Sequence, residues 1–401
     1  MIWRSSKTVK DDAPAAGIPK TGISQTPETK KEKEKEIMAK QNITTGAKFY
    51  TQVADVPFVG DTFPKFKAAA VQAAPVFLDR EATIDKMAGL VKEAKGNGAD
   101  LAVFAESFVP SFPHWCLFLP PVDQHQFYKR LFENAVDVPG PAFYRLANIA
   151  RENKIFLATG ITERSTEQFG SLWNSMLMFD REGNLIQHHR KIMPTWGEKL
   201  VWAGGDGSSI NVHDTELGKI GCLICGENGN QLALNALGAQ GEQVHMAMYP
   251  ATWPTRRQNG VYEDCLRVRT CSQAFQNKMF SICVSAALDE DAIKQMSCGD
   301  ADTEEWLRNN SYACSMIVGP NGLEISETIK DNKEGIAYAD IDTSQCIINK
   351  GIHDYWGAYQ RFDIFQLHVN KAPQRPAIFH NDECGFSEFI AYEEDKDLNK
   401  E

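Results

Sequence analysis

The chain has 401 residues, of which 43% are hydrophobic and 24% are charged, and its formal net charge is −11. This composition is typical of a globular protein that can bury a large core, and the acidic balance argues against binding to the phosphate backbone of nucleic acid. The longest apolar runs fall short of the roughly 18 residues that a membrane helix needs, so no membrane span is expected.

Residues 1–45 differ in composition from the rest of the chain. They contain nine basic and six acidic residues, a lysine- and glutamate-only run over 30–36, and almost no apolar pattern. Such a segment cannot bury enough apolar surface to offset the entropy lost on ordering, so we expect a disordered tail. Met38 lies within this tail, and the sequence alone leaves open whether it is the true start of translation.

Ten cysteines occur in the chain without the regular spacing of a disulfide framework, mostly inside apolar runs such as 280–284. Free cysteines in such runs behave as small core hydrophobes, which favours a reducing compartment. The N-terminus lacks the apolar stretch of a secretory signal, and Asp11 and Asp12 are unusual in a transit peptide. The expected location is therefore cytoplasmic.

From Phe66 onward, predicted strands alternate with predicted helices. Residues 67–73 and 101–105 are predicted strands, and the second is wholly apolar, as in strands that are buried on both faces. The helix between them has an apolar face made of Ile84, Met87, Leu90, Val91 and Ala94.

The later elements continue this alternation. Further strands are predicted over 155–158, 172–180, 185–190, 219–225, 244–249, 313–318, 323–328 and 335–341. Further helices are predicted after Pro141, through Leu232 and Leu237, and with one face made of Val261, Cys265, Val268, Ser272 and Phe275. Repeated βα units with interspersed hairpins indicate an α/β domain over 62–345. Residues 346–401 have weaker periodicity and are predicted to be a C-terminal extension.

Three chemically active residues follow three separate predicted strands: Glu106, Lys191 and Cys225. Ligand crevices form at the carboxyl ends of strands in open α/β sheets. Helix amides and a lysine near a cysteine at a strand-to-helix turn favour its thiolate, and a carboxylate can take or return its proton. Each residue alone has an ordinary explanation, either a solvated strand end or a buried packing cysteine.

The surroundings of these residues resemble the nitrilase branch of the carbon–nitrogen hydrolases over about 66–345. The matching stretches are Val103–Phe108 with Pro113, His189–Thr195, Glu198–Trp202, Gly218–Asn228, and Ala239–Gln243 with His245. The resemblance implies a four-layer α-β-β-α sandwich, no metal or organic cofactor, and homo-oligomers, from dimers to spirals. The extension 346–401 is expected to contribute to the oligomer contacts.

The resemblance also implies a role for each matched site residue. Cys225 is the expected nucleophile, Glu106 the general base and Lys191 the group that stabilises the tetrahedral intermediate. Glu198 matches a second family glutamate that positions the lysine or the substrate.

The expected reaction is hydrolysis of an organic nitrile to a carboxylic acid and ammonia through a thioimidate and an acyl thioester. An amidase, a nitrile-hydrating enzyme that releases the amide, and a non-catalytic structural homologue are the alternatives. The expected small-molecule partner is therefore a nitrile or an amide. The sequence leaves the preferred nitrile, the ratio of acid to amide and the oligomer length open.

Three positions depart from the family pattern and bear on the substrate. Gly226 follows the nucleophile where an aromatic residue is usual, Ala105 replaces the usual proline, and 357–363 is an altered form of a C-terminal motif. We expect Gly226, Trp115 and Trp253 to contribute to the substrate pocket. If Gly226 leaves free volume, bulky nitriles are expected to fit, unless a tryptophan fills that volume.

Two other interpretations concern possible metal or redox sites. Cys222 and Cys225 form a C-x-x-C pattern, but Cys222 lies inside a predicted strand, where a redox dithiol or zinc site is not expected. The adjacent His188 and His189 point to opposite faces of a strand and make a poor metal pair. His245, on an apolar strand, is interpreted as a hydrogen-bonded core residue.

Overall fold

The computed structural model describes residues 63–166, 168–253 and 262–375. The predicted tail over 1–45, with Met38, and the end of the predicted extension lie outside these ranges. The strands are β1 (Lys65–Gln72), β2 (Leu101–Phe104), β3 (Val136–Asp137), β4 (Phe156–Arg164), β5 (Leu172–Phe179), β6 (Leu185–Arg190), β7 (His213–Thr215), β8 (Gly218–Ile224), β9 (Val244–Tyr249), β10 (Phe280–Ser285), β11 (Met316–Val318) and β12 (Gly335–Asp342). The α-helices are α3 (Arg80–Gly96), α4 (His125–Asn134), α5 (Pro141–Asn153), α6 (Gln231–Gly238), α7 (Tyr262–Asn277), α8 (Glu290–Ser297), α9 (Ala301–Arg308) and α10 (Gln345–Lys350).

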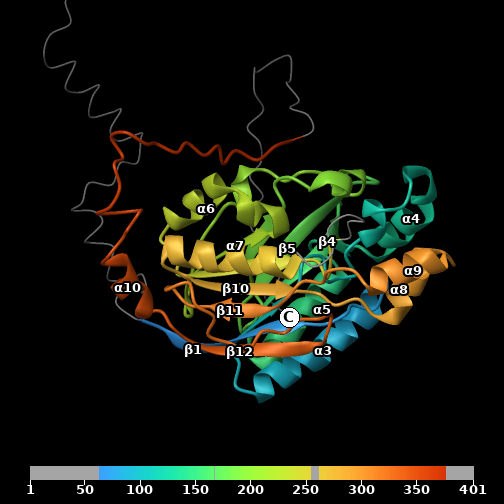
Figure 1. The fold of residues 1–401 in the computed structure, drawn as a ribbon, viewed down its shortest axis with the longest axis horizontal. Helices are drawn as coiled ribbons and strands as arrows, with labels where there is room; N and C mark the ends of the chain where they lie inside the picture. Colours follow the sequence, from blue (N-terminus) through green and yellow to red (C-terminus); the bar gives the residue numbers. More distant parts are fainter. Residues whose placement is uncertain (1–62, 167, 254–261, 376–401) are drawn as a thin grey trace, which may run out of the picture. The chain divides into compact units, whose positions relative to one another are not determined.

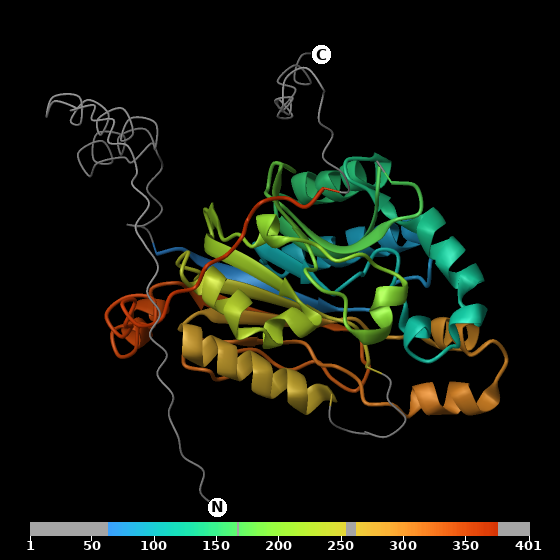
Figure 2. The ribbon, with the colours of Figure 1, turned by 90° about the horizontal axis from the view of Figure 1, so that it is seen from above.

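Two sheets lie face to face between two layers of helices (Figure 1). One sheet has the order β12-β1-β2-β4-β5-β6, with β3 beside β4, and the other has the order β11-β10-β9-β8-β7. Helices α3 and α5 cover the first sheet, while α7 runs along the second sheet, as the turned view shows (Figure 2). This arrangement confirms the predicted four-layer α-β-β-α sandwich.

The side chains of β1 show why its central part, residues 68–71, is apolar. Ala69 and Val71 pack into the cluster that includes the buried face of α3, whereas Ala68 and Ala70 face β9 and β10 in the cluster between the sheets. Alternate side chains of a strand point to opposite faces, so a strand with a helix on one side and a sheet on the other buries both faces. Burial on both faces was predicted for the neighbouring strand over 101–105, and β2, in which all residues are buried, confirms it.

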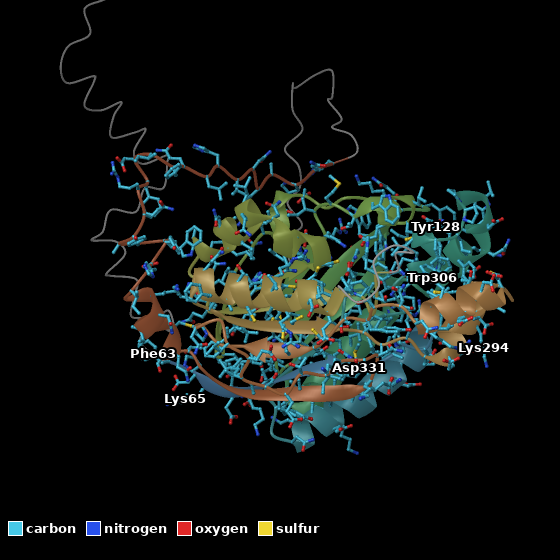
Figure 3. All side chains as sticks on the ribbon, in the orientation of Figure 1. Phe63, Lys65, Tyr128, Lys294, Trp306 and Asp331 are labelled. Carbon is cyan, nitrogen blue, oxygen red and sulfur yellow. The ribbon has the colours of Figure 1, made fainter. Side chains whose placement is uncertain are left out.

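Strand β12 forms one edge of the first sheet and pairs with β1. The two strands are antiparallel, and Lys65 Nζ lies 2.9 Å from a carboxylate oxygen of Asp342. Phe63 and Lys65 mark the start of β1 in the all-side-chain view (Figure 3). Because β1 then runs parallel to β2, and β8 parallel to β9, several strand ends meet at the same end of the sandwich.

Helix α7 differs from its prediction in the face that it buries. Within the described ranges, the face containing Val268 and Phe275 is exposed, and the helix instead buries Leu266, Gln273 and Ala274. The amide nitrogen of Gln273 has a partner inside the protein, because it donates a hydrogen bond to Ser281 Oγ at 2.7 Å. A buried polar group with a partner can therefore define the inner face of a helix while an apolar stripe remains outside.

The predicted strand over 323–328 forms only isolated bridges, from Val318 to Glu324 and from Ser315 to Ile329. A side chain interrupts the ladder here, because Ser326 Oγ accepts the hydrogen bond from Ile317 N at 2.8 Å. A regular hairpin would use a backbone carbonyl at this position.

After α10, the extension runs without regular secondary structure to residue 375. It contacts the domain at two places: Trp356 lies so close to Gly238 that a Cβ there would be 2.4 Å from the indole, and Gln374 N donates to Asp206 Oδ2 at 2.7 Å. Its role in oligomer contacts stays a prediction. Among the described residues, no helix is long and apolar enough to cross a membrane, and all nine cysteines are free thiols.

Candidate active site

Cys225 lies directly after β8, at the first position of a short 3-10 helix over Cys225–Gly229. Its φ angle is 51°, in the left-handed region that non-glycine residues rarely adopt. The side chain is almost fully buried, with 6% of its surface exposed. A residue held in such a conformation at a strand end is typical of a functional position, because the surrounding structure must stabilise the strain.

Glu106 follows β2 after one intervening residue and is completely buried. Its Oε1 accepts hydrogen bonds from Lys191 Nζ and from Asn174 Nδ2, both at 2.7 Å. Its Oε2 has no partner among the described residues. Burial raises the pKa of Glu106 to about 7, although the Lys191 charge acts in the opposite direction.

Lys191 follows β6 and joins two carboxylates. Its Nζ donates to Glu106 Oε1 and to Glu198 Oε2, each at 2.7 Å, and all three side chains are shielded from solvent. Burial disfavours the charged amine, but Glu106, Cys225 and Glu198 outweigh it and keep the pKa of Lys191 above its usual value. Lys191 is therefore a fixed cation at neutral pH.

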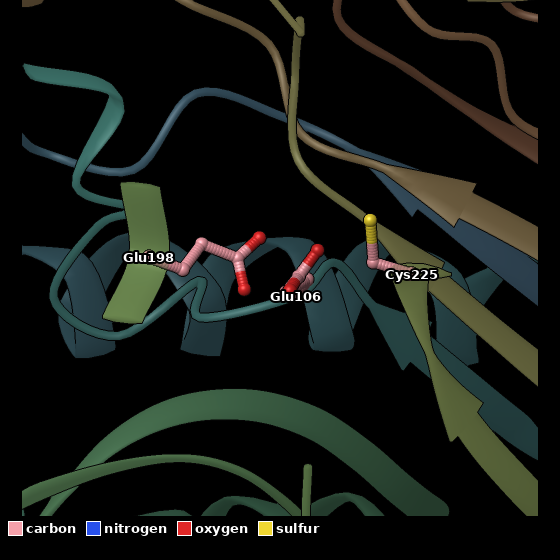
Figure 4. A group of neighbouring side chains, drawn as sticks. All are labelled: Glu106, Glu198 and Cys225. Carbon is pink, nitrogen blue, oxygen red and sulfur yellow. The ribbon is translucent and has the colours of Figure 1, made fainter. Parts of the chain in front are cut away.

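Glu198 is placed by a 3-10 helix over Trp196–Leu200, and its Oε2 also accepts from Thr195 N at 2.8 Å. Glu106 lies between Glu198 and Cys225 (Figure 4). One carboxylate or thiol atom of each of these three residues lies within 4.8 Å of the other two. The structure thus brings all four predicted catalytic residues together.

The Cys225 thiol is neutral at rest. Burial and the nearby Glu106 carboxylate raise the pKa of Cys225 well above its usual value, and the Lys191 charge only partly opposes them. Lys191 lowers the pKa of Cys225, as expected from the sequence, but the increase caused by burial is larger. Ionisation of Cys225 therefore requires a base, and Glu106, with a carboxylate oxygen within 4.8 Å of the thiol and a partner-free Oε2, is the candidate.

The same side chains can be compared with a metal-binding site. Glu106, Glu198 and Cys225 are the one group of ligand-type side chains with metal-site spacing in the described part of the chain. The ammonium of Lys191 already donates to both carboxylates, so a divalent cation at this position would meet a fixed positive charge. The group fits an acid–base role better than a metal role.

Glu227, which was not singled out from the sequence, forms hydrogen bonds to the backbone next to Lys191 and to the backbone next to Cys225. Its Oε1 accepts from Ile192 N at 2.6 Å, next to Lys191, and its Oε2 accepts from Ile224 N at 2.7 Å, next to Cys225. His189 Nε2 lies 2.9 Å from the same Oε2. A buried carboxylate therefore holds the lysine segment and the nucleophile strand in register.

His245 is confirmed as a hydrogen-bonded core residue. Its Nδ1 lies 2.7 Å from Glu242 Oε1, and its Nε2 lies 2.8 Å from Asn228 Oδ1. The amide of Asn228 in turn donates to the carbonyl of Cys225 at 3.2 Å. His245 therefore supports the nucleophile turn from behind.

The three residues predicted to contribute to the pocket lie in different surroundings. Trp115 is fully buried and stacks on Phe127, with ring centroids 5.6 Å apart. Trp253 is half-buried against the core cluster of the first sheet. A Cβ added at Gly226 would lie 2.9 Å from Thr195 Oγ1. Their contact with substrate stays a prediction.

We expect Gly226→Trp to reduce turnover of bulky or branched nitriles more than turnover of acetonitrile. The indole must displace Thr195 and then occupies space beside Cys225. Gly226→Ala is the matched control, since it adds the same Cβ without the ring. Rates for a series of nitriles of increasing size test this, and an unchanged size preference in Gly226→Trp would show that the position does not shape the pocket.

Residues 67–347 match the family described as carbon-nitrogen hydrolase. The chain belongs to the carbon-nitrogen hydrolase family. It is similar to a nitrilase of Bacillus sp. strain OxB-1, with 36% identity over 84% of this chain and 97% of the relative. An aliphatic nitrilase of Rhodococcus rhodochrous is 33% identical over 78% of this chain and 84% of its own length.

Solved structures support the fold of this carbon-nitrogen hydrolase. A carbon-nitrogen hydrolase from Helicobacter pylori G27 superposes with a TM-score of 0.61 at 18% identity, covering 75% of this chain and 97% of that one. Nit3 of Saccharomyces cerevisiae, a member of branch 10 of the nitrilase superfamily, gives a TM-score of 0.56 at 21% identity, covering 72% and 94%. The family membership shows that the chain is an enzyme that hydrolyses carbon–nitrogen bonds.

Proposed function

We propose that this carbon-nitrogen hydrolase converts an organic nitrile to a carboxylic acid and ammonia, with Cys225 as the nucleophile. The observation that carries the proposal is the buried cluster in which Glu106 lies beside Cys225 and shares the Lys191 ammonium with Glu198. The relatives named nitrilase, at 36% and 33% identity, favour nitriles over amides as substrates.

The first stage forms a covalent bond between enzyme and substrate. Glu106 Oε2 takes the proton of the Cys225 thiol while the sulfur attacks the nitrile carbon. One π bond of the nitrile breaks, its electron pair passes to nitrogen, and Glu106 returns the proton there. The product of this stage is a thioimidate, in which a carbon–nitrogen double bond remains.

The second stage uses two waters. Glu106 removes a proton from the first water as it adds to the thioimidate carbon and passes this proton to the nitrogen, which becomes an amine. The hydroxyl of the tetrahedral adduct then gives up its proton through Glu106 to the amine, the carbon–nitrogen bond breaks, and ammonia leaves as the carbonyl of the acyl thioester forms. The second water attacks the thioester in the same way and frees the acid and the Cys225 thiol. If the carbon–sulfur bond breaks in the first adduct instead, the product is an amide.

Lys191 stabilises the charge that develops on the substrate in these adducts. A fixed ammonium in a buried site is already oriented, so it stabilises this charge without reorganisation of solvent. Glu198 keeps the ammonium in place, because its Oε2 holds Nζ at 2.7 Å and is itself held by Thr195 N. Glu198 thus acts as a positioning residue.

The test is an assay of the purified full chain against aliphatic, aromatic and arylacetonitriles and the matching amides. Acid, amide and ammonia are all quantified. Ammonia and acid in equal amounts from nitriles support the proposal, and amide as the main product indicates the nitrile-hydrating alternative. Turnover of amides with none of nitriles would replace the proposal with an amidase.

We expect kcat/KM for a neutral nitrile to rise as the pH increases through about 7 and then level off. Glu106 accepts the Cys225 proton only when ionised, and its pKa is about 7. The control is Asn174→Ala: the Asn174 hydrogen bond lowers the pKa of Glu106, so its removal moves the rising limb to higher pH. A rising limb that Asn174→Ala does not move would exclude Glu106 as the base.

A further inference from the structure

Arg269 on α7 is a half-buried cation without an acidic partner. None of the carboxylates in the described ranges forms an ion pair with it, and the polar side chain that its guanidinium meets there is the neutral hydroxyl of Tyr249. Arg267, two residues earlier on the same helix, pairs with Glu263 at 3.0 Å and also with Glu324. A guanidinium that is removed from water without a counter-charge costs free energy unless a ligand supplies that charge.

The Arg269 side chain lies on the active-site side of its helix. A Cβ built on Gly229 would be 3.8 Å from Arg269 Nε, and Gly229 ends the short helix that Cys225 begins. The Arg269 Cζ also lies 6.0 Å from the centre of the Tyr249 ring. Since the guanidinium charge lowers the pKa of Cys225, against the larger effect of burial, the two groups interact electrostatically.

Two tyrosines complete this corner of the site. Tyr249 ends β9, one position after Met248, which pairs with Ile224 in the parallel strand that leads into Cys225. Tyr262 begins α7 and packs against the cluster that contains both Tyr249 and Cys225. Tyr249 is completely buried, so its ring lies level with the nucleophile and inside the protein.

The Tyr262 hydroxyl has no hydrogen-bond partner in the part of the chain that the structure describes, and the Tyr249 hydroxyl meets the Arg269 guanidinium, which is itself a donor, so its own proton has no acceptor there. Buried polar atoms are almost always paired, so each unpaired one calls for an explanation. Burial also raises the pKa of both tyrosines well above the ordinary value, so both hydroxyls keep their protons and remain donors. One guanidinium and two hydroxyl protons therefore lie near Cys225 without a carboxylate that pairs with them in the described part of the chain.

We propose that Arg269, with the hydroxyls of Tyr249 and Tyr262, binds a carboxylate group on the substrate, so that short cyanocarboxylates are the preferred nitriles. The inference rests on the proposed nitrile hydrolysis and adds a substrate class to it. A carboxylate has only acceptor atoms, and its planar shape matches the fork of a guanidinium. The substrate must be short because Arg269 lies against Gly229, one helical turn from Cys225.

The experiment compares charged and neutral nitriles of equal length on the full chain. The substrates are 3-cyanopropanoate and 4-cyanobutanoate, each set against the methyl ketone in which a methyl group replaces one carboxylate oxygen. Ammonia release gives kcat and KM for each. We expect the carboxylates to have a kcat/KM at least about tenfold above the ketones, as charge-assisted hydrogen bonds allow.

Arg269→Gln is expected to remove this preference by raising KM for the carboxylates, with little change for the ketones. Tyr249→Phe and Tyr262→Phe each reduce the preference, and Arg267→Gln, the matched control, keeps it. Circular dichroism verifies that each variant is folded. Binding of the cyanocarboxylates to Cys225→Ala, measured by calorimetry with and without Arg269→Gln, reports on the site independently of turnover.

The outcomes separate this inference from the proposed function. Hydrolysis of the ketones without any preference for the carboxylates overturns the carboxylate site alone. An equal fall in kcat for both substrate types in Arg269→Gln also overturns it, because Arg269 would then act on Cys225. If no nitrile is hydrolysed at all, the proposed function fails and this inference fails with it.

Discussion

Cys225→Ala is expected to abolish nitrile turnover while leaving the fold intact. Removal of the sulfur removes the covalent route entirely, and the rate loss should be on the order of 10⁴-fold or more, as for nucleophiles that act as one unit with their base. The structural cost is small, because the change deletes a single atom at a position that already has 6% of its surface exposed. The rate of ammonia release and the thermal unfolding midpoint test the two halves of this prediction.

Cys222→Ala is the matched control. Cys222 lies three residues earlier in the same strand and packs into the cluster between the sheets, with 2% of its surface exposed. Its loss is expected to lower stability slightly and to leave turnover nearly unchanged. If the Cys222 variant is as inactive as the Cys225 variant, a dithiol mechanism replaces the single nucleophile.

The strand ends of this protein were predictable from sequence because two-sided burial makes the strand before Glu106 wholly apolar and the strand before Cys225 apolar after Lys219. A charged or nucleophilic residue after such a run marks the point where a strand leaves the core. Lys191 follows a third predicted strand, and the family resemblance then added Glu198. Glu106, Lys191 and Cys225 meet in the structure because their strands end at the same end of the sandwich, and the 3-10 helix over Trp196–Leu200 brings Glu198 to them.

The groups that support these residues could not be found in the same way. Asn174 lies in the middle of β5, and only the sheet pairing brings its amide within 2.7 Å of Glu106. Glu227 directly follows the predicted site, but its two backbone partners are 35 and 3 residues away in sequence. Hydrogen bonds across strands depend on register, and periodicity in one strand carries no information about it. The buried face of α7 could not be predicted for a related reason. Gln273 is polar in sequence, and only the structure shows the hydrogen bond to Ser281 that allows its burial.

Lys191→Met is expected to be inactive and also strongly destabilised. Methionine has nearly the volume of lysine but leaves Glu106 and Glu198, both fully buried, without their shared cation. Loss of one partner from a buried charge cluster costs on the order of 3–5 kcal/mol of unfolding free energy. Since Lys191 lowers the pKa of both carboxyls, its loss raises those values further and drives both groups towards the protonated form.

The pH dependence of stability distinguishes this mechanism from a simple packing defect. A carboxyl whose pKa in the folded protein exceeds its unfolded value stabilises the fold when protonated, and this contribution is lost as the pH rises through the folded pKa. The deficit of Lys191→Met relative to wild type should therefore grow between pH 6 and pH 8, and a constant deficit would contradict the charge argument. Adding Glu198→Gln removes one of the two stranded charges and should restore much of the stability but none of the turnover, because Lys191 is still needed to stabilise the adduct. Denaturant unfolding at several pH values, with ammonia release measured on the same samples, therefore separates the structural role of the lysine from its catalytic role.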